Sequence, residues 1–350
     1  KCWDRVEPIN GGLLLWHGQG PGATHRRVLP GLLDYALCRG LKIDVLCPAH
    51  DDRPSPSAAG REYRFHAWIK YYSGLYMFNR LYRVRDVADD YRGIVLPDTV
   101  DQGFKPHTIR RARTLAFRHV GYQHEETGRG VPHHIVSFVS PNTRIAGVAR
   151  CVPLVWRGIE IDSKLAAVSA RSRPLVLLLG QSADGIGRIP FGIKNQHAFE
   201  FMRCIRRPDL NLGGSEDGGF PVGVKCHVDL VPERLMALLS EASYVIYCGG
   251  EKVDATLSAA SGATQLAFSM GCLLVAPEGT GDALGLGKCS VIECAVGGEV
   301  ELCMKPELSG VFRDREHLTS ERNYQLDRWL SFSPELEMSP RLPSSIPAVV

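Results

Sequence analysis

Two basic residues in a glycine-rich stretch are the strongest chemical signal in this sequence. Arg188 and Lys194 follow the apolar run Leu175–Leu179 and stand among closely spaced glycines. Glycine lets a backbone approach a ligand closely, and fixed cations stabilise the charge that develops on a departing diphosphate. The pattern therefore predicts that Arg188 and Lys194 bind a diphosphate. A solvated loop with surface cations is the alternative interpretation.

A second glycine-rich turn separates the apolar run Leu13–Trp16 from a helical pattern. Amides at the amino end of that helix would face a ligand, and the helix dipole favours negative charge there. The turn has neither the GxGxxG spacing of dinucleotide folds nor the Lys-Ser/Thr pair of a phosphate loop. We expect it to contact phosphate or sugar through Gly18, Gly20 and Gly22, with a tight turn that binds no ligand as the alternative.

Carboxylates and an imidazole follow two predicted strands, over residues 93–96 and 118–123. The carboxyl ends of parallel strands meet at one edge of a sheet, where open α/β sheets bind ligands. A carboxylate in such a cleft can act as a general base. Glu125 is the first choice and the two aspartates are the second, with solvated surface groups as the alternative. The candidate catalytic residues are His124, Glu125, Asp98 and Asp101.

Small hydroxyl and amide side chains precede and open a helix predicted over residues 263–270. Such groups suit ribose and sugar hydroxyls, and they equally suit helix capping. The candidates are Ser258, Ser261, Gly262, Thr264 and Gln265.

Aromatic and basic residues are interleaved between residues 61 and 85. Aromatic platforms with cations between them can hold an unstacked nucleic-acid strand or a flipped base. Aromatic residues at helical spacing also form ordinary core, which is the alternative. The candidate contacts are Arg64, Trp68, Lys70 and Tyr72.

The composition excludes several classes of protein. With 350 residues, 44% hydrophobic and 23% charged, the chain is globular, and its net charge of +3 is too balanced to prove a nucleic-acid partner. No apolar run approaches the roughly 20 residues of a membrane span, and we see no clustered metal ligands. Eleven cysteines without CxxC spacing predict buried thiols and an intracellular location, with a trimmed targeting segment as the alternative.

Apolar runs alternate with helical patterns along the chain, which predicts parallel strands and crossover helices in two doubly wound α/β domains facing a common cleft. We expect domains over 1–152 and 153–312, a closing helix over 313–334 and a loose tail over 335–350. Strands are predicted over residues 13–16, 42–47, 93–96, 118–123, 134–139, 175–179, 222–225, 244–248 and 273–276 and near 291. Helices are predicted over 24–39, 109–117, 196–205, 232–241, 263–270 and 315–329.

Six segments in this order resemble the GT-B class of nucleotide-sugar glycosyltransferases over about residues 12 to 330. They are HIVSFVSPNTR, VWRGIEIDSKL, PLVLLLGQ with GIKNQHAFEFM, HVDLVPERLMALLSEASYVIYC, SGATQLAFSMGCLLVAPEGTG and the closing helix. The resemblance implies two Rossmann-like domains and a nucleoside-diphosphate sugar as co-substrate, with a UDP-sugar favoured and no tightly bound cofactor. It also implies that Val228 and Leu230 pack on the nucleotide base.

The segment GYQHEE is similar to the YQHD stretch of the DNA glucosyltransferases of T-even phages. The similarity implies that His124 touches the sugar or acceptor and that Glu125 stands at the catalytic aspartate. Together with the aromatic and basic segment, it indicates a hydroxymethylated DNA base as the acceptor. A glycan, lipid or small-metabolite acceptor is the alternative. The retaining subclass has two acidic donor-site positions, which fall near Ser258 and near Gln265 or Leu266 here, and none of these residues is acidic. This keeps a non-catalytic binding or structural subunit as a third hypothesis.

Overall fold

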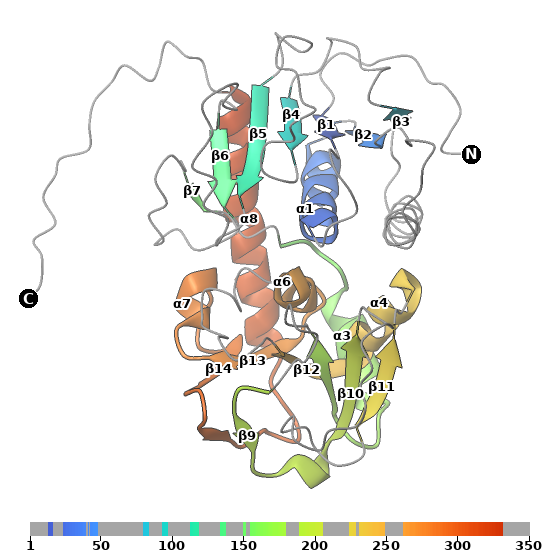
Figure 1. The fold of residues 1–350 in the computed structure, drawn as a ribbon, viewed down its shortest axis with the longest axis vertical. Helices are drawn as coiled ribbons and strands as arrows, with labels where there is room; N and C mark the ends of the chain where they lie inside the picture. Colours follow the sequence, from blue (N-terminus) through green and yellow to red (C-terminus); the bar gives the residue numbers. More distant parts are fainter. Residues whose placement is uncertain are drawn as a thin grey trace, which may run out of the picture.

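The structure is a computed structural model. It describes residues 13–16, 24–39, 41, 43–47, 80–83, 93–96, 113–118, 134–137, 150–151, 155–179, 189–205, 224–228, 231–248 and 262–331. The chain forms two parallel sheets, each with its own helices, and one long helix runs beside both (Figure 1). This arrangement confirms the predicted fold class of two doubly wound α/β units. We call the part built on the first sheet the first lobe and the part built on the second sheet the second lobe.

The first sheet has the strand order β3-β2-β1-β4-β5-β6-β7, and every pairing is parallel. Successive strands are added on one side of β1 and then on the other, so the order reverses between β1 and β4. The helix α1 (Thr24–Cys38) connects β1 to β2. The strands are β1 (Leu13–Trp16), β2 (Ile43–Cys47), β3 (Arg80–Arg83), β4 (Gly93–Leu96), β5 (Arg113–Arg118), β6 (His134–Ser137) and β7 (Arg150–Cys151).

The second sheet has the order β11-β10-β8-β12-β13-β14, again all parallel, and it reverses between β8 and β12. Every residue of β8 is buried, as expected for a parallel strand covered on both faces. The strands are β8 (Leu175–Leu179), β10 (Glu200–Ile205), β11 (Lys225–Val228), β12 (Ala242–Tyr247), β13 (Leu273–Pro277) and β14 (Val291–Cys294), with the small pair β9 (Gly192–Ile193) and β15 (Glu299–Val300) beside them.

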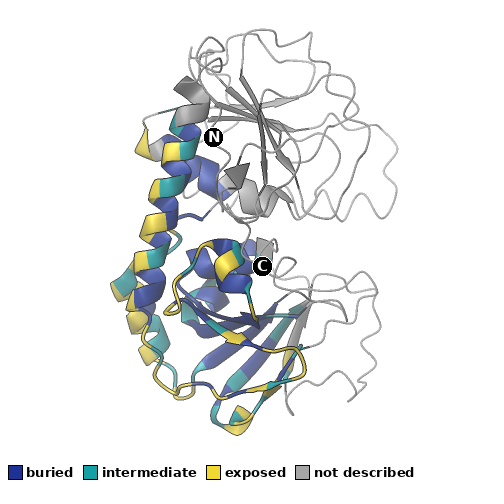
Figure 2. Cartoon of the chain, turned by 90° about the vertical axis from the view of Figure 1, so that its left-hand side faces the viewer, coloured by how far each residue is buried: buried dark blue, intermediate teal, exposed yellow. Residues whose placement is uncertain are grey.

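Helices surround the second sheet, and the last helix continues to the first lobe. They are α3 (Ile161–Ser169), η3 (Gln196–Ala198), α4 (Pro232–Glu241), α6 (Gly262–Ser269), α7 (Thr280–Leu284) and α8 (Ser309–Ser331). Figure 2 shows α8 along one side of both lobes, with its exposed residues on the outer side. No helix among the described residues is both long enough and apolar enough to cross a membrane.

Two predicted helices are wrong. Residues 200–205 form the strand β10, which pairs with β8 on one side and β11 on the other. Its apolar residues Phe201 and Cys204 are three positions apart, a spacing that also occurs on one face of a helix. A strand covered on both faces need not alternate apolar and polar residues, so this spacing is compatible with a strand. Residues 113–118 form β5 between β4 and β6, although the pattern predicted a helix there and a strand from residue 118.

Other differences concern elements that the sequence analysis missed or placed differently. No strand was predicted at β3, within the aromatic and basic segment, and no helix was predicted at α3 or α7. The helix α8 begins at Ser309 instead of residue 313. The boundary between residues 152 and 153 and the tail over 335–350 lie outside the described residues and stay predictions.

The expectation of buried thiols holds for only part of the described cysteines. Cys248, Cys272 and Cys294 are buried, whereas three others are exposed. The exposed ones are Cys38, Cys289 and Cys303.

Candidate functional site

The carboxyl edges of the two sheets point toward each other. Figure 1 shows β4, β5 and β6 directed toward the second lobe, and β10 and β11 directed toward the first. In open α/β sheets the ligand crevice lies at the carboxyl edge, where the strand order reverses. These points are the ends of β1 and β4 in one sheet and of β8 and β12 in the other. The candidate site is therefore the region between the loops that follow these four strands.

The first sheet places two groups of predicted site residues after neighbouring strands. The glycine turn with Gly18, Gly20 and Gly22 follows β1, and Asp98 and Asp101 follow β4. These two strands pair directly, with Leu13 opposite Gly93. All five residues lie outside the described part of the chain, so their geometry stays a prediction. What the structure adds is that their loops start side by side at the reversal point.

The candidate base starts farther from its strand than the sequence analysis predicted. The strand β5 ends at Arg118, so five residues separate it from His124 and six separate it from Glu125. Both residues lie outside the described ranges. Because β5 pairs with β4, their segment begins next to the loop that carries Asp98. Among the described residues the strand before Glu125 therefore covers Arg113–Arg118, and the placement and role of Glu125 stay predictions.

The first turn of α1 carries basic residues that the sequence analysis overlooked. His25, Arg26 and Arg27 follow Thr24, and that turn contains no acidic residue. Positive charge at a helix amino end is unfavourable unless an anion compensates for it, because the helix dipole is positive there. A count of charges in the residues just after the glycine turn would have found this signal.

The second sheet places the predicted base contact and the start of α6 at its carboxyl edge. Val228 is the last residue of the edge strand β11, and Val231 precedes α4 with 48% of its surface exposed. The helix α6 begins at Gly262, after β12. Leu230, Arg188, Ser258 and Ser261 lie outside the described residues, and their roles stay predictions.

Thr264 and Gln265 do not offer their side chains to solvent. Each is 2% exposed, within α6. The Thr264 hydroxyl has no hydrogen-bond partner in the described part of the protein. Burial this deep favours packing beneath α6 over contact with sugar hydroxyls. The prediction that both bind the donor is therefore not supported, because the helix turns them toward the core.

Lys194 lies at the wrong edge of the second sheet for a donor contact. It follows β9, and its backbone N–H donates to the carbonyl of Val300 in β15. Six residues later Glu200, the first residue of β10, pairs with Leu175 at the amino end of β8. The Lys194 side chain is 56% exposed, and its Nζ lies 4.0 Å from Glu299. In Figure 1, β9 is at the end of the second lobe farthest from the first.

The prediction that Lys194 binds a diphosphate in the crevice is thus contradicted. Its basis was the glycine-rich stretch with fixed cations after Leu175–Leu179, which was expected to lead into a helix over 196–205. Residues 200–205 are instead a strand parallel to β8, so the chain after β8 must run back to the amino edge of the sheet before β10 begins. Lys194 lies in this connecting segment.

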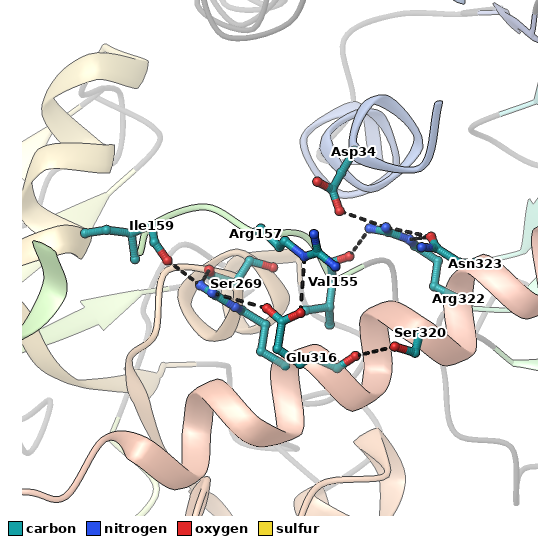
Figure 3. A network of polar contacts seen from close by, with 10 residues as sticks. Asp34, Val155, Arg157, Ile159, Ser269, Glu316, Ser320, Arg322 and Asn323 are labelled. Atoms are coloured by element: carbon teal, nitrogen blue, oxygen red, sulfur yellow. Dashed lines mark hydrogen bonds and ion pairs between the residues drawn. The ribbon is translucent and has the colours of Figure 1, made fainter. Parts of the chain in front are cut away.

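A buried polar network joins α1, α8 and the segment that connects the two lobes (Figure 3). Arg322 of α8 is fully buried, and its Nη2 donates to Asp34 Oδ2 of α1 at 2.8 Å. Its Nη1 donates to the carbonyl of Val155, and its Nε donates to Asn323 Oδ1 at 3.0 Å. One guanidinium therefore holds together α1, α8 and the segment that connects the lobes.

Arg315, two turns earlier on α8, makes the corresponding contacts with the second lobe. Its Nη1 donates to the carbonyls of Ile159 at 2.7 Å and of Ser269, at the end of α6, at 3.2 Å. Its guanidinium lies 4.4 Å from the centre of the Phe312 ring. Burial lowers the pKa of Arg315. The sequence analysis missed Asp34, Arg315 and Arg322; an aspartate within the apolar stretch of α1 was the available signal.

The described residues contain no group of three or more His, Cys, Asp or Glu side chains close enough together to hold a metal ion.

Comparisons with known proteins agree on the fold. No protein-family model and no curated protein sequence matches this chain. The crystal structure of AviGT4, a glycosyltransferase involved in avilamycin A biosynthesis, matches with a TM-score of 0.55 at 13% identity, covering 92% of this chain and 98% of that one. At this identity the likeness shows the fold alone.

Two further structures match less well. An alpha-glucosyltransferase in complex with UDP and a 13-mer DNA has a TM-score of 0.48 at 9% identity, covering 92% of this chain and 93% of that one. The glycosyltransferase SnogD from Streptomyces nogalater has a TM-score of 0.46 at 15% identity, covering 92% and 100%.

Proposed function

Because the chain has the GT-B fold, we propose that it is a glycosyltransferase that uses a nucleoside-diphosphate sugar, with UDP favoured as the nucleotide. The observation that carries this proposal is the pair of parallel sheets whose carboxyl edges, where their strand orders reverse, are directed toward each other (Figure 1). Each reversal point is a ligand site in open α/β sheets. Two that face each other can hold a donor on one side and an acceptor on the other.

In this proposal the second lobe binds the donor. Val228 and Leu230 pack on the base at the end of β11, and Arg188 stabilises the diphosphate. The amides that open α6 at Gly262, with Ser258 and Ser261 before it, meet phosphate and ribose oxygens. Lys194 has no part in this site.

The first lobe completes the site. The glycine turn after β1 closes over the donor phosphates and sugar, and the basic first turn of α1 adds positive charge next to it. Glu125, or alternatively Asp98 or Asp101, accepts the proton of the acceptor hydroxyl or stabilises charge on the sugar. The acceptor oxygen bonds to the anomeric carbon while the bond from that carbon to the diphosphate breaks. The nucleoside diphosphate then leaves with the electron pair, and His124 contacts the sugar or acceptor.

For the acceptor we propose a hydroxymethylated DNA base. The support is the aromatic and basic segment with Arg64, Trp68, Lys70 and Tyr72, which ends in β3 next to β2 in the first sheet. Release of counterions from DNA phosphates makes such binding strongly salt-dependent. DNA affinity should therefore fall steeply between about 50 and 200 mM salt. A shallow dependence would favour a glycan, lipid or small metabolite.

Two measurements test the proposed activity. Calorimetry with UDP, GDP and ADP should show heat for at least one nucleotide. Mass spectrometry with a panel of nucleotide sugars and hydroxymethylated DNA should then identify the sugar that is transferred or hydrolysed. If no nucleotide binds and no sugar is consumed, the protein is a non-catalytic subunit on this fold. The absence of acidic residues at positions 258 and 265 favours that second candidate.

A further inference from the structure

The helix α1 is held between elements of the other lobe. It packs against α6, and its second half contacts α8 through three polar side chains. Asp34 meets Arg322, Tyr35 donates to Asp327 at 2.8 Å, and Arg39 forms an ion pair with Asp327 at 2.5 Å. The position of α1 is therefore set by its packing against α6 of the second lobe together with these polar contacts to α8.

The buried pair differs from the surface pair in what it can specify. The side chains of Arg322 and Asp34 are 0% and 7% exposed, whereas those of Arg39 and Asp327 are 43% and 39% exposed. A buried ion pair is often no more stabilising than apolar side chains of the same volume. Its hydrogen bonds, however, are directional. Arg322 satisfies Asp34 and the Val155 carbonyl together in one arrangement of α1, α8 and the connecting segment.

The arrangement of α1 matters because this helix begins directly after the glycine turn. From Asp34 back to Thr24 the helix is about 15 Å long, so a tilt of about 10° at Asp34 would displace its first residue by about 2.6 Å. Pro30 lacks an amide hydrogen and removes one helical hydrogen bond between these points. Orientation of α1 therefore depends on its buried stretch, residues 30–36.

We propose that Asp34 and Arg322 are positioning residues for the sugar transfer. They fix α1, and with it the amino end of this helix, against the donor held by the second lobe. This inference rests on the proposed function, because it presumes that the amino end of α1 faces a nucleotide sugar. A misplacement of about 1 Å can lower turnover about 10²-fold, so the displacement estimated above is large enough to matter.

The test uses two conservative variants and a matched control. Asp34→Asn keeps the shape of the side chain and removes its charge, and Arg322→Lys keeps the charge but not the fork of donors. Asp327→Asn disrupts the exposed pair between the same two helices. We expect kcat to fall about 10²-fold in the first two variants and to stay within about twofold in the control. The Kd for UDP, measured by calorimetry, should stay within about threefold in all three, since the second lobe holds the nucleotide.

A double variant keeps the test decisive if the single variants fold poorly. Asp34→Leu with Arg322→Met replaces the pair by apolar side chains, which buried positions usually tolerate. It should fold and bind UDP, yet its kcat should stay at least about tenfold lower, because apolar contacts do not fix the orientation of α1. Wild-type kcat in this double variant would overturn the proposal.

Amide hydrogen exchange separates the failure of this inference from the failure of the proposed function. Asp34→Asn should speed exchange in residues 31–36 and leave β8 protected, whereas Asp327→Asn should change neither. If the wild-type protein turns over no nucleotide sugar, the proposed function fails. Unchanged exchange in α1 of Asp34→Asn, or equal loss of protection in α1 and β8, would overturn the positioning role whatever the activity.

Discussion

Gly271 gives a sharp test of the packing that joins α6 to α8. It ends α6 with φ +69°, its N–H donates to Phe268, and the next N–H, of Cys272, donates to Ala267. This is the Schellman pattern, in which glycine adopts the left-handed conformation. A Cβ at this position would lie only 2.6 Å from Cζ of Phe312. Gly271→Ala therefore combines backbone strain with a clash against α8.

The expected loss is the sum of two contributions. A side chain in the left-handed region costs about 1–2 kcal/mol. Moving the Phe312 ring, which is 6% exposed and lies beneath the guanidinium of Arg315, is a case of overpacking and costs about 1–3 kcal/mol more. The free energy of unfolding should thus fall by about 2–5 kcal/mol in Gly271→Ala.

Gly297 supplies the control, because it has φ +79° and no atom within 4 Å of the added Cβ. Gly297→Ala should lose only the backbone contribution, about 1–2 kcal/mol. Urea unfolding followed by circular dichroism measures both variants. Stability changes at independent sites are compared to within about 0.5 kcal/mol. If Gly271→Ala and Gly297→Ala lose the same free energy of unfolding within that range, the clash of the added Cβ with Phe312 does not exist as described.

Three further predictions follow from other parts of the structure. Lys194→Ala should leave turnover and UDP affinity within about twofold of wild type, whereas Arg188→Ala should lower turnover about 10²- to 10³-fold; equal losses would return Lys194 to the donor site. Burial lowers the pKa of Lys164 in the folded protein below the 10.5 of the unfolded chain. Between these two pKa values only the unfolded state holds the proton of Lys164, so the free energy of unfolding rises with pH. The free energy of unfolding of wild type, relative to that of Lys164→Met, should therefore increase toward pH 10.5 in urea titrations. A difference between the two proteins that does not change with pH would contradict the lowered pKa of Lys164. Asp34→Asn should lower the free energy of unfolding by about 3–5 kcal/mol and Asp327→Asn by less than about 1 kcal/mol, and similar losses in urea unfolding would show that burial does not distinguish the two pairs.

The sequence predicted elements well where local chemistry decides the structure. The apolar run Leu175–Leu179 and the helix Pro232–Glu241 have the predicted bounds. The first is an uninterrupted apolar segment of strand length, and the second combines proline at its first position with an amphipathic pattern. Neither needs information from distant parts of the chain.

The failures have a different cause. The strand β10 is buried between β8 and β11, so its apolar residues follow no period of two, and local spacing alone favoured a helix. That single error also placed Lys194 at a ligand edge. An error in one element therefore becomes an error about chemistry when a site residue is placed by its distance from that element.

The site could be predicted only as far as the loops that carry it. Sequence patterns place Gly18 and Asp98 after strands, but they do not say that β1 and β4 are neighbours, because strand order is set by long-range pairing. Asp34 and Arg322 are separated by 288 positions, and nothing local marks them as partners. Such contacts become visible only in the folded chain.

The position of the junction is the physical reason for the positioning role that we propose for Asp34 and Arg322. The helix α8 and the segment over residues 155–159 run together past the crevice. Arg315 holds both to the second lobe, and Arg322 holds both to α1. Figure 2 shows α8 on one side of the two lobes. Since a small rotation of α1 at Asp34 grows with distance along the helix, the directional hydrogen bonds of Arg322 fix the amino end of α1 more strictly than apolar contacts of equal stability would.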